Sequence, residues 1–139
     1  MTTGTVVSLP DGDGPDSIAR RPGLSSGWPM WEVQPGPGPE STRAARICAA
    51  INREDPASPI TLMAFGATAL LLPSIAVAQR AAHRRVMEYV LVEPEVPPVS
   101  EAWPDAPVTV FTDGESSPAA LRGWTVLPTA DLATWAPSG

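Results

Sequence analysis

The side chains in this sequence best suited to chemistry are carboxylates that follow short apolar runs. A carboxylate held in an apolar cleft can have a raised pKa and act as a general acid or base. On an exposed loop the same group only interacts with solvent, and the sequence leaves this alternative open. The residues that follow the apolar runs are Asp11, Asp13, Gly66, Glu93, Glu95, Asp113, Glu115 and Asp131.

Other reactive groups are scarce. The chain has one histidine, His83, one cysteine, Cys48, and no lysine. Without lysine, Schiff-base chemistry and a P-loop are excluded. One histidine and one cysteine do not provide the ligand set of a zinc site, so we predict no metal and no cofactor. We expect Cys48 to be a small core residue and His83 to be a solvated residue at a helix end.

These carboxylates must be positioned by elements around the stretch Ile60–Gln79, which is a long run without charge. Ile60–Phe65 is apolar and β-branched at its start, which predicts a buried strand, and helical spacing of apolar residues follows. The small residues Gly66 and Ala67 between them predict a tight turn. A membrane span is the alternative, but Pro73 and the lack of an aromatic belt and of a flanking basic loop argue against it.

The rest of the chain predicts further short strands alternating with helices. We expect a three-layer α/β fold with a mostly parallel sheet of about five or six strands and helices on both faces. The expected strands are Thr5–Leu9, Trp28–Gln34, Val86–Val92, Val108–Phe111 and Trp124–Leu127, and the expected helices are Thr42–Arg53 and Ser116–Leu121.

At 139 residues the chain is expected to form a single domain, residues 1–139. Thirteen of the thirty residues in 10–39 are Pro or Gly, a composition typical of loops and of partly disordered segments. In parallel α/β sheets, ligands bind outside the carboxyl ends of the strands. The residues that follow the strands are therefore the candidate site.

The stretch Ala64-Phe65-Gly66-Ala67-Thr68 resembles the nucleophile elbow of the α/β-hydrolases, whose motif is G-x-S-x-G. The similarity extends through LLLPSIAVA and RRVMEYVLVEPEVPP, as in actinobacterial members of that family. It implies a shortened α/β-hydrolase fold. Gly66 occupies the serine position, so the resemblance does not carry the hydrolytic chemistry over.

The resemblance also implies where the other triad members would lie. Asp113 and Glu115 fall where the family often places its acid. The loop with the family's histidine reads Thr129-Ala130-Asp131 here. Two of the three triad members are therefore missing, and we predict that the protein is not a serine hydrolase. The candidate catalytic residues are Glu93 and Asp113, and the candidate substrate-binding residues are Phe65, Gly66, Ala67 and Asp11.

Two classes of function remain. In the first, a catalytically degenerate hydrolase scaffold performs non-hydrolytic small-molecule chemistry, such as cyclisation, isomerisation or dehydration, in specialised metabolism. In the second, the protein is a non-catalytic carrier, chaperone or partner subunit. A closed apolar cavity with a buried carboxylate would favour the enzyme, and a flat apolar face would favour the accessory protein.

The composition indicates which binding partners and which cellular compartment to expect. With 15 acidic and 9 basic residues, the chain lacks a basic patch for a phosphate backbone, so nucleic acid is not an expected partner. A single cysteine and an N-terminus without a signal peptide indicate a cytoplasmic protein. A sheet shorter than that of a complete α/β-hydrolase predicts an exposed edge or helix face. We therefore expect a homodimer, with Trp124 and Trp135 as interface anchors.

Overall fold

The computed structural model describes residues 4–9, 29–95, 97, 103–114 and 122–135. Part of the Pro- and Gly-rich segment, residues 10–28, lies outside these ranges. The expected short helix Ser116–Leu121 and the candidate residues Asp11, Asp13 and Glu115 also lie outside the described residues.

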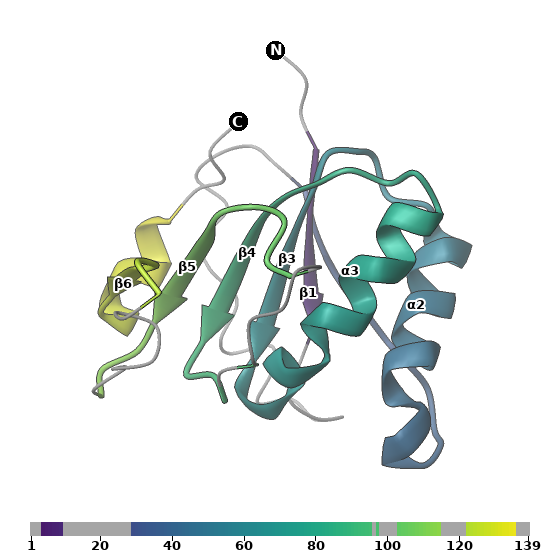
Figure 1. Cartoon of the computed structure of the whole chain (residues 1–139), viewed down its shortest axis with the longest axis horizontal. Coiled ribbons are helices and arrows are strands. Elements are labelled where there is room, and N and C mark those ends of the chain that lie inside the picture. The colour runs from purple at the N-terminus through teal and green to yellow at the C-terminus, as the bar shows by residue number, and fades with distance from the viewer. Residues whose placement is uncertain (1–3, 10–28, 96, 98–102, 115–121, 136–139) are drawn as a thin grey trace.

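Within these ranges the chain forms one six-stranded sheet in the order β2-β1-β3-β4-β5-β6. Every neighbouring pair of strands is parallel, so the predicted α/β fold with about five or six strands is confirmed (Figure 1). The strands are β1 Thr5–Leu9, β2 Met30–Glu32, β3 Ile60–Phe65, β4 Val86–Val92, β5 Val108–Phe111 and β6 Thr125–Leu127.

The central position of β3 follows from its composition. All six of its residues are buried, as expected for a parallel strand that is covered on both faces. It pairs with β1 on one side and β4 on the other, and Phe65 lies opposite Val92 at the end of the ladder. The predicted bounds of this strand are those of the structure.

The helical elements of the described residues are two α-helices, α2 Arg43–Glu54 and α3 Leu72–Ala81, and three 3-10 helices. Those three are η1 Glu40–Thr42, η2 Gly66–Leu71 and η3 Thr129–Thr134. Pro73 lies in the first turn of α3, where its missing N–H costs no helical hydrogen bond. The uncharged stretch Ile60–Gln79 thus forms a strand, a 3-10 helix and most of an α-helix. In the described part of the chain no helix is long and apolar enough to cross a membrane.

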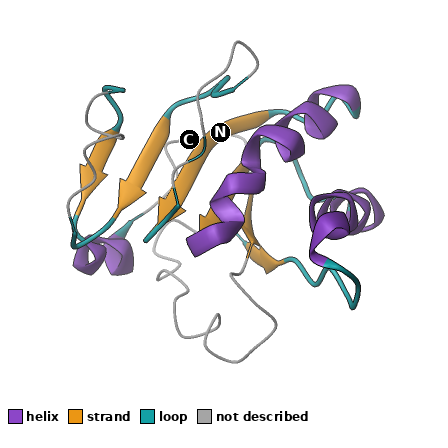
Figure 2. Ribbon diagram, turned by 60° about the horizontal axis from the view of Figure 1, so that its bottom comes forward, coloured by secondary structure: helices purple, strands orange, loops and turns teal. Residues whose placement is uncertain are grey.

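The two α-helices share one face of the sheet (Figures 1 and 2). Ile47, Ile51 and Ile75 pack there against the strands in one core cluster. The opposite face carries a second cluster, to which η3 contributes Leu132. We expected helices on both faces. In the described residues, a 3-10 helix packs against this second face and both α-helices lie on the other, so the third layer of the fold is thin.

Aromatic residues extend the helix-side core beyond α3. Trp103 is fully buried, and its ring lies 5.5 Å from that of Tyr89 and 5.6 Å from that of Trp124, both in edge-to-face geometry. Trp135 packs against the second cluster. Trp124 and Trp135, expected as interface anchors, thus make contacts within the chain.

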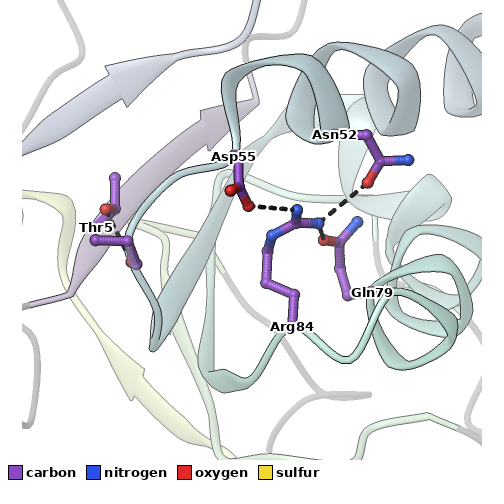
Figure 3. A network of polar contacts seen from close by, with 6 residues as sticks. Thr5, Asn52, Asp55, Gln79 and Arg84 are labelled. Atoms are coloured by element: carbon purple, nitrogen blue, oxygen red, sulfur yellow. Dashed lines mark hydrogen bonds and ion pairs between the residues drawn. The ribbon is translucent and has the colours of Figure 1, made fainter.

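The C-terminal ends of α2 and α3 are joined by Arg84 (Figure 3). Its guanidinium donates to Asn52 Oδ1 at 3.2 Å, to Gln79 Oε1 at 2.8 Å and to Asp55 Oδ1 at 3.1 Å. The Arg84 side chain is 8% exposed, whereas that of Asp55 is 83% exposed. The part-buried contact with Gln79 therefore matters more for stability than the exposed contacts with Asn52 and Asp55.

We predict that Arg84→Met lowers the free energy of unfolding by about 2 kcal/mol, because Gln79 and Asn52 lose a charged hydrogen-bond donor. Asp55→Asn should cost less than about 1 kcal/mol, as for an exposed ion pair. Asparagine also tolerates the left-handed backbone of Asp55, whose φ is 47°. Urea denaturation of both variants checks this. Equal losses would show that the ion pair is the main interaction.

Candidate functional site

The residues that follow β3, β4, β5 and β6 meet at the carboxyl edge of the sheet, because parallel strands end on the same side. Gly66 follows β3, Glu93 follows β4 and Thr112 follows β5. Pro128 and then Thr129 follow β6. Contacts among these loops bring most of the described candidate residues together.

Gly66 makes the turn out of the central strand. Its φ is 57°, a left-handed conformation that glycine adopts without the steric cost of a Cβ. The Gly66 carbonyl accepts a hydrogen bond of 3.1 Å from the Glu95 N–H, which ties the loop after β4 to this turn. The expected strand-to-helix turn at Gly66 is therefore present.

Glu93 is exposed and also has a positive φ, 44°. Its N–H donates to the Phe111 carbonyl at 2.8 Å. Its carboxylate accepts from Thr112 Oγ1 and from the Asp113 N–H, both at 3.2 Å. A non-glycine residue in this conformation requires such support from its surroundings. The end of β5 thus holds both the backbone and the side chain of Glu93.

Asp113 is bound to the start of η3. Its two carboxylate oxygens accept from the Thr129 N–H at 3.0 Å and from Thr129 Oγ1 at 2.6 Å. The Thr129 hydroxyl, and then its N–H, lower the pKa of the exposed Asp113 carboxyl. A carboxyl with a lowered pKa stays ionised at neutral pH, so Asp113 is poorly suited to donate a proton.

The other two candidate substrate-binding residues that the structure describes, Phe65 and Ala67, differ in exposure. The Phe65 side chain is buried in the second core cluster, so it is part of the core that packs against the sheet. Ala67 is exposed beside Gly66.

Two threonines, absent from the predicted site, organise the carboxylates at this edge. Thr112 donates to Glu93 while accepting from the Gly114 N–H at 3.2 Å, and Thr129 holds Asp113. The sequence signal for both is a threonine directly at or just after a strand end, next to an acidic residue or a proline. That signal is weak, because threonine is common in turns.

The carboxyl edge does not include Cys48, His83 or Tyr89. Cys48 is half-buried against the helix-side core, and burial raises the pKa of its thiol, as expected for a packing residue. His83 is exposed after α3 with φ 59°. Burial, together with the hydrogen bond to Asp105, raises the pKa of the Tyr89 phenol. No group of three or more His, Cys, Asp or Glu side chains in the described ranges is placed to hold a metal ion.

Comparison with known proteins relates the chain by fold. No family model and no curated protein match the sequence. The structure is similar to that of RedJ, solved with a PEG molecule bound in the active site, with a TM-score of 0.63 and 16% sequence identity. The similarity covers 96% of this chain and 84% of the RedJ chain. At this identity it shows a shared parallel α/β fold.

We predict that Gly66→Val destabilises the protein by roughly 2 kcal/mol, because a β-branched residue fits poorly at positive φ. Gly66→Ser should be milder. Ala67→Val at the adjacent exposed position is the control and should change the melting temperature little. If Gly66→Val melts at the wild-type temperature, the turn does not require a left-handed residue.

We predict that Thr129→Val raises the pKa of Asp113 toward its ordinary value of about 4, because the largest cause of its depression is removed. A depressed native pKa stabilises the fold above the unfolded-state pKa, and this contribution is lost as the pH falls through the native pKa. The wild type should therefore lose this contribution at a lower pH than the variant. Carboxyl-detected NMR titration measures the pKa, and an unchanged value would contradict the assignment to Thr129.

Proposed function

We propose that this protein is a catalytically degenerate α/β-hydrolase-like protein that performs non-hydrolytic chemistry on a small molecule bound above Gly66. The observation that carries the proposal is the pair Asp113 and Thr129. Asp113 lies where the resembling family often places its acid, and Thr129 begins the loop in which that family has its histidine. The two side chains are hydrogen-bonded at 2.6 Å. In this proposal the contact corresponds to the acid–base pair of a hydrolase, with Thr129 in place of the imidazole.

The nucleophile position supports the same proposal. Gly66 has the positive φ of a strained elbow, 57°, but no hydroxyl or thiol with which to form a covalent intermediate. A glycine at this position carries no side chain that could attack a scissile bond. A ligand bound there would meet backbone and carboxylates but no nucleophile.

Glu93 is the better candidate for proton transfer. Both oxygens of Asp113 accept from Thr129, and its pKa is lowered. Each oxygen of Glu93 receives one hydrogen bond in the described part of the chain, at 3.2 Å. Glu93 would remove a proton from the substrate and return it at another atom, as in an isomerisation or cyclisation. We propose specialised metabolism as the setting, from the resemblance to actinobacterial members of the family.

A second candidate is a non-catalytic binding or accessory protein. It is favoured by the exposure of both carboxylates and by their hydrogen bonds to neighbouring loops, which are the contacts of structural groups. Glu93→Gln separates the two functions once a ligand is identified. An enzyme would keep ligand binding and lose turnover, whereas a carrier would keep its full activity.

We predict that the wild type hydrolyses p-nitrophenyl esters no faster than a heat-killed control. Gly66→Ser alone should also be inactive, because a serine without a base is a weak nucleophile. The double variant Gly66→Ser/Thr129→His places an imidazole next to Asp113 and should exceed either single variant by roughly 10²-fold. Labelling by a fluorophosphonate probe gives a second measure of an activated serine.

The matched control is Gly66→Ser/Ala130→His, in which the histidine lies one residue from the position that contacts Asp113. Wild-type turnover above the heat-killed control would contradict the proposed loss of hydrolysis. Equal labelling of the two double variants would contradict the assignment of Thr129 to the histidine position.

A further inference from the structure

The outer face of η2 and α3 carries an exposed seam of five uncharged residues. Ala67, Leu70, Ser74, Val77 and Ala81 are all exposed and recur at alternating spacings of three and four. Leu70 is 44% exposed and Val77 is 51% exposed. This is the a/d pattern of a helix that packs along another helix, but the seam faces away from the core residues Leu72, Ile75 and Ala76.

The seam alternates small and large side chains. Small residues stand at 67, 74 and 81, and large ones at 70 and 77. When two copies of such a helix run antiparallel, a and d positions face each other, so each large side chain meets a small one. In a parallel pair, large would meet large and small would meet small. The pattern therefore fits a second copy of the same helix when the two helices run antiparallel.

Charge at the two ends of this helical segment favours the same orientation. At the C-terminal end, Arg80, His83, Arg84 and Arg85 lie within six residues. Arg80 pairs with Asp105 and Arg84 with Asp55, and Arg85 is an additional exposed positive charge. At the N-terminal end, the exposed residues Glu93 and Glu95 lie beside the Gly66 turn. An antiparallel pair places each basic end against the acidic end of the other copy.

We propose that the seam is the interface of a two-fold homodimer in which η2 and α3 of two copies pack antiparallel. A two-fold axis between Ser74 and Val77 makes the contact isologous, since each surface meets its own copy, and it places Ser74 opposite Val77 and Leu70 opposite Ala81 of the other copy. One helical segment per copy is a small interface, so the dimer is weak and depends on protein concentration. The paired charges act at the rim, where salt screens them.

Light scattering coupled to gel filtration tests this over a concentration series. The mass should rise from 14.5 kDa toward twice that value, and added salt should lower it. Val77→Glu should raise the dissociation constant by roughly tenfold or more. The control Ala49→Glu, at an exposed position on α2, should leave the constant unchanged. Circular dichroism verifies that both variants fold.

A charge exchange tests the orientation. Arg85→Glu should weaken the dimer, and the double variant Arg85→Glu/Glu95→Arg should restore it. In a Cys48→Ser background, a mixture of Ser74→Cys and Val77→Cys chains should form a cross-linked dimer on oxidation, whereas a mixture of Ser74→Cys and Ala49→Cys chains should not. A mass of 14.5 kDa at every concentration up to about 1 mM would overturn the proposal. A dimer unaffected by Val77→Glu would also overturn it.

Discussion

The constraint on which the structure depends is the burial of β3 on both faces. Ile60–Phe65 has no exposed residue, so β1 and β4 must flank it while helices and loops cover it above and below. A strand placed in this way has to leave the sheet at its end. Gly66 allows that exit, because its left-handed backbone turns the chain directly into η2.

The same geometry builds the carboxyl edge. Once the strands are parallel, the loops after β3, β4, β5 and β6 must meet, and their polar groups need partners. Glu93 and Asp113 supply acceptors for the loops that follow β5 and β6. The carboxylates that could do chemistry are thus also the groups that hold these loops together. A single exposed edge serves as both scaffold and candidate site.

This dual use bears on the choice between an enzyme and a binding protein. Asp113 is held by two hydrogen bonds from one residue, which suits a permanent structural role. Glu93 is in a strained backbone conformation, and strain of this kind is often retained where a side chain must point in a fixed direction. Of the two carboxylates, Glu93 is therefore the one to which we assign the proposed chemistry, and Asp113 is the one to which we assign an anchoring role.

The sequence by itself determined the strands and the turn. The run Ile60–Phe65 predicts its strand because burial of both faces favours apolar side chains. Val86–Val92 predicts a strand in the same way, although the buried Glu88 interrupts its apolar run. The glycine between the strand and the helix predicts the positive φ of Gly66, because glycine has no Cβ that would clash in that conformation.

Only the tertiary structure decided which groups meet. The contact between Asp113 and Thr129 joins residues 16 positions apart, and no local pattern encodes it. Both α-helices also pack on one face, a choice that depends on the handedness and length of each connection. The outward direction of Leu70 and Val77 likewise follows from which side of α3 meets the sheet. Periodicity alone identified them as part of an apolar helix but could not show that they lie on its solvent face.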